Sequence, residues 1–162
     1  MKYFGYLLLA FLILVADQWT KALAQQHLSA TSAVEITSFL QFVLVYNRGA
    51  AFGFLAGAGG WQLYLFAGLA LVIAVVLPVW IWRCYKTNAT LAIGLACVLG
   101  GAIGNLIDRL NLQYVVDFIS LHYAGWYFPA FNIADIAITL GAICLILDSF
   151  GIYPRNPKSV EN

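Results

Sequence analysis

Four apolar stretches, each close to the length that crosses a bilayer as a helix, dominate this chain of 162 residues. A transmembrane helix needs about 20 consecutive apolar residues. The stretches lie at about 3–23, 61–82, 90–109 and 130–152. Only 9% of the residues are charged, whereas a soluble domain has about a quarter. The sequence therefore predicts an all-α integral membrane protein, a bundle of four transmembrane helices that forms a single domain over residues 1–153.

The basic residues indicate how this bundle is oriented, because cytoplasmic loops of membrane proteins carry an excess of Lys and Arg. With the N-terminus inside, Lys2, the turn at 83–86 and the tail at 154–162 all lie in the cytoplasm. The remaining basic residues then lie on the other side: Lys21, Arg48 and Arg109. We therefore expect both termini in the cytoplasm and a polar, disordered C-terminal tail.

The N-terminal stretch has an alternative interpretation. A basic residue, an apolar run and then Ala22-Leu23-Ala24 resemble a signal peptide with its cleavage site. Asp17 and Lys21 interrupt the end of this run, however. A retained first span is the better interpretation.

Two outer segments connect the predicted spans, at about 24–60 and 110–129. Residues 34–46 of the first are rich in β-branched and aromatic residues, which predicts a small β-rich segment of one or two strands. Residues 49–55 are apolar but too short to span, so they lie either along the membrane surface or as a loop on the bundle. The aromatic residues of 110–129 form either an interfacial belt or the wall of a groove that accepts lipid.

Polar side chains concentrate near the outer ends of three predicted spans. Residues three or four apart share a helix face. Three such faces are expected to meet at one depth: Asp17 with Lys21, Asn105 with Asp108 and Arg109, and Asn132 with Asp135. Asp117 would join them from the loop at 110–129. Asp148 lies about 20 Å beyond Asp135 along a helix, so we exclude it from the site and interpret it as an interfacial acid.

Asp117 and Asp135 are the strongest candidates for catalysis. A carboxylate near the bilayer centre costs about 2.5–3.5 kcal/mol, so intramembrane acids are functional candidates. Two carboxylates with opposed protonation states commonly activate water, which favours a hydrolase. The Asp17–Lys21 pair is better explained as an ion pair that fixes helix packing. Arg109 could hold a carboxylate or a lipid phosphate in a bidentate grip.

Other chemistries lack their motifs. The sequence has no HExxH zinc motif and no G-x-S-x-G elbow, and its 3 cysteines match no zinc pattern. Gly100 and Gly104 have the spacing of close helix contacts rather than of a phosphate loop. A net charge of +1 without a basic run makes nucleic acid an unexpected partner. A transporter would need polar residues through the whole membrane depth, and a scaffold would leave the costly acids unexplained.

Five blocks in order carry a resemblance to a known family: Asp17-Gln18-Trp19-Thr20-Lys21, Asn47-Arg48-Gly49-Ala50-Ala51-Phe52, Gly101-Ala102-Ile103-Gly104-Asn105-Leu106-Ile107-Asp108-Arg109, Val115-Val116-Asp117-Phe118 and Phe131-Asn132-Ile133-Ala134-Asp135. They resemble the signature blocks of bacterial lipoprotein signal peptidase (signal peptidase II). The resemblance implies a four-helix aspartyl endopeptidase of the bacterial inner membrane, with its site near the periplasmic face. It also implies that the substrates are prolipoproteins whose cysteine carries diacylglycerol, and that cleavage falls just before that cysteine.

The resemblance further assigns roles to residues. Asp117 and Asp135 match the catalytic pair. The positions that match the lining or support of the site are Asn47, Gly49, Asn105, Asp108, Arg109, Asn132, Asp17 and Lys21. The resemblance also implies that globomycin-type cyclic peptides inhibit the protein. We expect the reaction to need no cofactor or metal. We expect a monomer in contact with membrane lipids, with residues 49–55, including Phe52 and Phe54, clamping the acyl chains.

The two aspartates should share one proton at neutral pH, because two carboxyl groups at close range do not both ionise readily when their negative charges repel each other. Asp135 is expected near the start of the fourth helix, where the helix dipole favours negative charge. Arg109 could instead favour an ionised Asp117. The sequence leaves this choice open, with a slight preference for an ionised Asp135.

Overall fold

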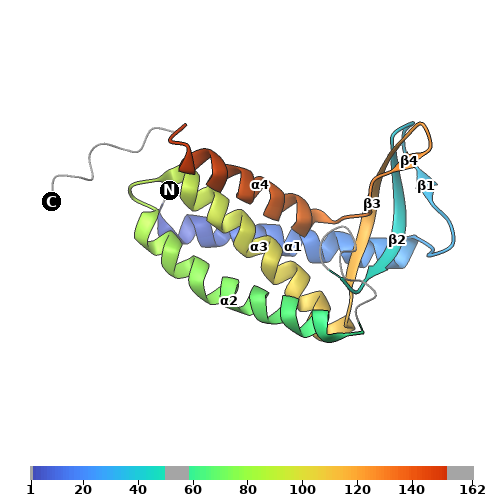
Figure 1. Cartoon of the computed structure of the whole chain (residues 1–162), viewed down its shortest axis with the longest axis horizontal. Helices are drawn as coiled ribbons and strands as arrows, with labels where there is room; N and C mark the ends of the chain where they lie inside the picture. The colour runs from blue at the N-terminus through green and yellow to red at the C-terminus, as the bar shows by residue number, and fades with distance from the viewer. Residues whose placement is uncertain (1, 50–58, 153–162) are drawn as a thin grey trace.

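The computed structural model describes residues 2–49 and 59–152, and its helices form a bundle with a small sheet at one end (Figure 1). The helices are α1 (Tyr3–His27), α2 (Trp61–Cys84), α3 (Ala89–Leu112) and α4 (Ile133–Ser149). The residues 50–58, with Phe52 and Phe54 of the expected lipid clamp, and the tail at 154–162 lie outside the described residues.

Among the described residues, three helices are long and apolar enough to cross a membrane: α1, α2 and α3. The fourth predicted span corresponds to α4, which has 17 residues and is therefore about 25 Å long at 1.5 Å per residue. The chain is thus mostly helical, with strongly apolar helices. That α4 also spans the membrane remains a prediction.

Helix α3 is the most buried helix and packs against the three others. Its glycines permit this contact, as their spacing predicted. A Cβ at Gly100 would lie 2.5 Å from the carbonyl oxygen of Ala10 on α1, and a Cβ at Gly101 would collide with the carbonyl oxygen of Ala134 on α4. At the end away from the sheet, the core is built from Tyr6, Ile81 and Leu95, which are almost fully buried.

The sheet has four antiparallel strands in the order β1-β2-β3-β4, and they are β1 (Val34–Glu35), β2 (Leu40–Asn47), β3 (Val115–Tyr123) and β4 (Trp126–Tyr127). The expected strands at 34–46 correspond to β1 and β2. The treatment of 110–129 as a loop was wrong, because β3 and β4 lie there. Residues Val115–Phe118 are all buried, and a strand that is buried on both faces lacks the alternation that reveals a strand in a sequence.

Asp148 lies at the end of α4, and its place at the membrane interface stays a prediction. It is only 8% exposed and accepts a hydrogen bond from Asn88 Nδ2. Asn88 is the N-cap of α3, where the helix dipole favours a negative charge. Asp148 therefore ties the end of α4 to the start of α3.

Candidate active site

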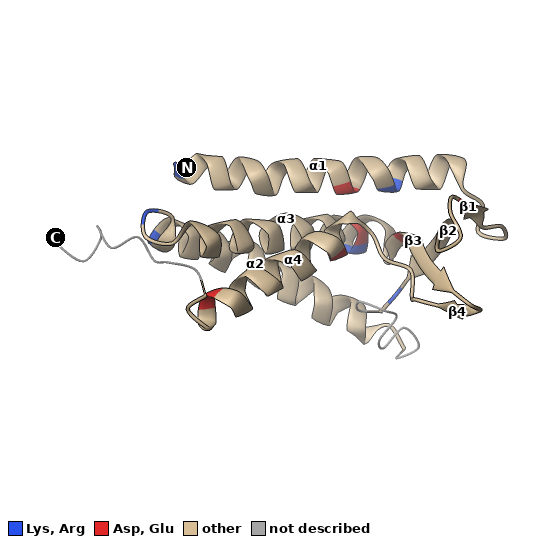
Figure 2. Ribbon diagram, turned by 90° about the horizontal axis from the view of Figure 1, so that it is seen from above, with Lys and Arg blue, Asp and Glu red and all other residues tan. Residues whose placement is uncertain are grey.

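All the site residues predicted from the sequence lie in one connected polar network at the end of the bundle nearest the sheet. Figure 2 shows charged residues of α1 and α3 gathered toward this end. Five elements or segments contribute: α1, the end of β2 with the residues after it, α3, β3 and the start of α4.

A buried ion cluster joins α1 to α3. The Lys21 ammonium lies 2.8 Å from Asp17 Oδ2 and 3.0 Å from Asp108 Oδ2, and it donates to Asn105 Oδ1 at 2.8 Å. The three charged side chains are at most 4% exposed. The ammonium therefore has an acceptor for each of its three protons.

Gln18 is a member of the network that sequence reasoning missed. Its Nε2 donates to Asp108 Oδ1 at 2.9 Å and to the Gly104 carbonyl oxygen at 3.1 Å. Gln18 directly follows Asp17, and adjacent helix residues do not share a face. Only its place within a signature block could have pointed to it.

Asp117 lies on β3, opposite Val45 of β2, and is 1% exposed. It accepts hydrogen bonds from Asn132 Nδ2 at 2.7 Å and from Asn47 Nδ2 at 2.9 Å. Burial raises the pKa of Asp117, and the negative charge of Asp135 raises it further, to about 7, although the two amide donors lower it. Asp117 is therefore a carboxyl group that titrates near neutral pH.

Asp135 lies in the first turn of α4, as the sequence predicted, and forms a capping box with Asn132. Asn132 Oδ1 accepts from the Asp135 backbone N–H at 2.9 Å, and Asp135 Oδ2 accepts from the Asn132 N–H at 3.3 Å. The other carboxylate oxygen accepts from Asn105 Nδ2 at 2.8 Å. The capping box holds the carboxylate at the positive end of the helix dipole.

Three asparagines present their amide N–H groups to the two aspartates, and the contacts of their oxygens fix this orientation. Asn105 Oδ1 faces the Lys21 ammonium, which can only donate. Asn132 Oδ1 accepts from the start of α4, and Asn47 Oδ1 accepts from Gly49 N–H at 2.8 Å. Each Nδ2 must therefore point at a carboxylate.

Arg109 does not hold a carboxylate in a bidentate grip in this structure. It donates to two carbonyl oxygens instead, at 3.2 Å to Asn105 and at 3.1 Å to Gly49. Its guanidinium lies 5.4 Å from the ring centroid of Phe66 on α2, within the range of a cation–π contact. Arg109 therefore links α2 and α3 to Gly49, whose N–H group orients Asn47.

A cavity of about 260 Å³ between α2, α3 and α4 opens on the network. Asn105, Arg109 and Asp135 form its polar part, and apolar residues of the three helices, such as Leu69 and Ile138, form most of the rest. Among the described residues, no cluster of three His, Cys, Asp or Glu side chains is placed to ligate a metal. The cavity brings an apolar surface directly to the Asp135 carboxylate.

The fold and the site define a helical membrane protein in which two aspartates accept hydrogen bonds from asparagine amides, and one of them, Asp135, lines a largely apolar cavity. The sequence model of the family described as Signal peptidase (SPase) II matches residues 9–151, and the chain belongs to this family. It is 48% identical to the lipoprotein signal peptidase of Acinetobacter baumannii over 94% of this chain and 87% of the relative. It is 51% identical to that of Pseudomonas aeruginosa over 93% and 88%.

The fold is similar to that of a bacterial membrane enzyme solved by the in meso method. The TM-score is 0.80 at 29% identity, and the match covers 98% of this chain and 93% of the other. The sequence-based assignment to the family is thus confirmed.

Proposed function

We propose that this protein is a membrane-embedded aspartic endopeptidase that removes signal peptides from diacylglyceryl-modified prolipoproteins, cleaving just before the lipidated cysteine. Membership of the signal peptidase II family supports the removal of signal peptides from prolipoproteins. The aspartic mechanism rests on one observation in particular. Asp117 and Asp135 come from different elements, and each accepts a hydrogen bond from an asparagine amide within one connected polar network.

In the proposed mechanism the two aspartates begin in different protonation states, one neutral and one ionised. Burial, and then the charge of Asp135, raises the pKa of Asp117 to about 7, so Asp117 is the member that holds the proton. Asp135 is the ionised member, supported by its helix N-terminus and by Asn105. This assignment agrees with the slight preference from the sequence.

The reaction then needs only these two groups and a water molecule. Ionised Asp135 takes a proton from water as the water oxygen attacks the scissile carbonyl carbon. Protonated Asp117 donates a hydrogen bond to the carbonyl oxygen as negative charge develops there. When the C–N bond breaks, a proton from the pair passes to the leaving amine, and the pair returns to one shared proton.

The membrane would deliver the substrate from the side. An acyl chain gains about 0.8 kcal/mol for each CH₂ group that it buries, so two chains anchor the modified cysteine strongly. The apolar part of the cavity beside Asp135 provides such a surface. We propose four spans in the bacterial inner membrane, both termini in the cytoplasm, and the site near the periplasmic face.

A gel-shift cleavage assay on a diacylglyceryl-modified prolipoprotein tests this function. We expect Asp117→Asn and Asp135→Asn each to lower the cleavage rate by at least about 100-fold, the lower end of the effect of an acid–base group. Asp148→Asn is the matched control, because Asp148 is also buried but is bonded to Asn88 instead. If either site variant cleaves at the control rate, that aspartate has a structural role only.

A further inference from the structure

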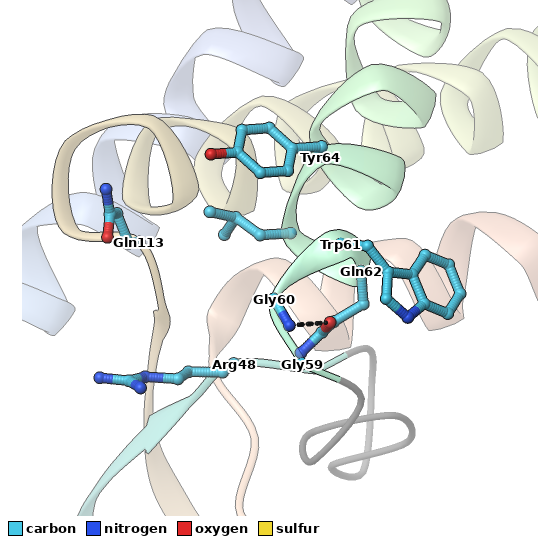
Figure 3. A pocket seen from close by; sticks show the side chains of 8 residues that line it. Arg48, Gly59, Gly60, Trp61, Gln62, Tyr64 and Gln113 are labelled. Carbon is cyan, nitrogen blue, oxygen red and sulfur yellow. Dashed lines mark hydrogen bonds between the residues drawn. The ribbon is translucent and has the colours of Figure 1, made fainter.

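A second and larger hollow, of about 690 Å³, lies where the start of α2, the end of α3 and the end of β2 meet (Figure 3). It is lined by Gln62 of α2, by Arg48 directly after β2 and by Gln113 directly after α3. Neither Asp117 nor Asp135 lines it, and its described lining residues include no acidic side chain. It therefore differs from the cavity beside Asp135 in both place and charge.

Gln62 supplies the first evidence for a ligand here. It is only 2% exposed, and its Oε1 accepts from the Gly60 backbone N–H at 2.8 Å, as the dashed line in Figure 3 shows. Its Nε2 has no acceptor among the described residues, although the side chain lines the hollow. Polar groups with little exposure are almost always paired, so this N–H group, which lines the hollow, favours an oxygen acceptor bound there.

The hollow is also electropositive. The N-cap of α2 is Gly60, which has a φ of 100° and provides no side-chain cap. The first N–H groups of a helix lack partners within it, and together with the helix dipole they attract anions. Arg48 adds a full positive charge at the same hollow. The Gln62 amide, the N-terminus of α2 and the charge of Arg48 thus favour the binding of an oxyanion in the hollow.

The position of the hollow at the start of an apolar helix suggests where that oxyanion comes from. Trp61 and Tyr64 line the hollow and are 55% and 76% exposed, and exposed Trp and Tyr mark the headgroup level of a membrane. Large apolar side chains continue the exposed face along α2: Leu65, Leu69, Val72 and Val76. A phospholipid would place its phosphate in the hollow and its chains along this face.

We infer that this hollow binds the phosphate of an anionic phospholipid headgroup, held by Arg48, Gln62 Nε2 and the N-terminus of α2. Arg48 stands between Asn47, which donates to Asp117, and Gly49, which accepts from Arg109. The lipid site therefore borders the candidate active site but does not depend on its chemistry.

Native mass spectrometry of the detergent-solubilised full chain tests this inference by comparing bound phosphatidylglycerol with bound phosphatidylcholine. Both lipids carry a phosphate, but phosphatidylcholine also carries a quaternary ammonium that Arg48 repels. We expect the wild type to prefer phosphatidylglycerol, and Arg48→Gln to bind it about tenfold more weakly, the loss expected for one charge-assisted hydrogen bond. Arg83→Gln, which removes the same charge at the other end of α2, should bind as the wild type does.

Gln62→Glu gives a second, sharper variant. The carboxylate still accepts from Gly60 but replaces the free N–H group by a negative oxygen, so the preference for phosphatidylglycerol should disappear. Thermal unfolding checks that each variant is folded. If Gln62→Glu does not fold, the result for Arg48→Gln alone decides whether the site exists.

Equal weakening by Arg48→Gln and Arg83→Gln would overturn the site in favour of general surface charge, and so would unchanged binding in Arg48→Gln. A parallel measurement with inorganic phosphate and phosphatidylcholine, without phosphatidylglycerol, distinguishes free phosphate from a lipid headgroup as the source of the bound phosphate. If phosphate binds there at Arg48 while phosphatidylglycerol shows no preference, the lipid assignment is wrong.

Discussion

Replacing Lys21 by methionine removes a buried ammonium and leaves Asp17 and Asp108 without their shared counter-ion. Removing one partner of a buried ion pair destabilises a protein by about 3–5 kcal/mol, because the remaining charge stays buried. Both carboxylates keep donors, however. Asp17 still accepts from Ala134 N–H at 2.9 Å, and Asp108 still accepts from Val116 N–H at 3.0 Å. We therefore expect a loss of about 3 kcal/mol, the lower end of that range.

The same substitution should also disturb the active site. Lys21 holds Asn105 Oδ1, and this contact directs Asn105 Nδ2 to Asp135. Without Lys21 only the longer contact from Asn132 Nδ2, at 3.3 Å, still orients the Asn105 amide, so its hydrogen bond to Asp135 weakens. We expect the cleavage rate of the folded Lys21→Met protein to fall by at least about tenfold, equivalent to the loss of one hydrogen bond of about 1.4 kcal/mol.

Reversible unfolding in mixed detergent micelles measures the stability, and the gel-shift assay measures the rate. Lys2→Met is the matched control, because it removes the same charge from an exposed residue of the same segment. The double variant Asp17→Asn with Lys21→Met should lose less stability than the sum of the two single variants, because it removes a pair. A loss below about 1 kcal/mol, typical of a surface pair, would refute the buried ion cluster.

Three further substitutions or conditions test other parts of the site. Gly104→Ala would place a Cβ 2.5 Å from a carboxylate oxygen of α1 and should cost about 1–3 kcal/mol by overpacking; Gly68→Ala, with open space around its Cβ, should be neutral or stabilising in the same unfolding assay. Asn132→Ala and Asn88→Ala each remove a helix N-cap and should each cost about 0.5–2 kcal/mol, but only Asn132→Ala should also lower the cleavage rate. Because the pKa of Asp117 is raised to about 7, its proton is lost as the pH rises through 7, so the cleavage rate should fall above this pH; a rate that stays constant from pH 6 to 9 would contradict a protonated Asp117.

The same raised pKa has a consequence for stability, with a defined sign. Between its ordinary value of 3.8 and about 7, Asp117 binds its proton more tightly in the folded than in the unfolded protein. The free energy of unfolding should therefore decrease as the pH rises through this window. Asp117→Asn should remove this contribution, which unfolding at several pH values can measure.

Local relations within one helix could be predicted from the sequence, and relations between elements largely could not. The Asp17–Lys21 pair and the Asn132–Asp135 cap follow from spacings of four and three residues. The bond from Asn105 to Asp135 joins residues 30 apart on two helices, and no local spacing predicts it. The common depth expected for these residues in the membrane indicated that they lie close together, but not which side chains form hydrogen bonds with one another.

Two differences between expectation and structure have clear physical reasons. Strand β3 was missed because its first residues are buried on both faces and so show no alternation. The carbonyl partners of Arg109 were missed because one of them, Gly49, lies 60 residues away and offers only its backbone. The sequence displays side chains, and a contact to a main-chain oxygen leaves no trace in it.

The ion pair within α1 has a consequence for the order in which the protein is made. Lys21 and Asn105 are separated by 84 residues, so α1 emerges from the ribosome long before its partners on α3 have been synthesised. Asp17 and Lys21 are four residues apart and can therefore pair on a lone helix. Helix α1 can therefore insert into the bilayer with the charge of Lys21 already paired with that of Asp17. When α3 packs against α1, this ion pair becomes part of the network that supports the site.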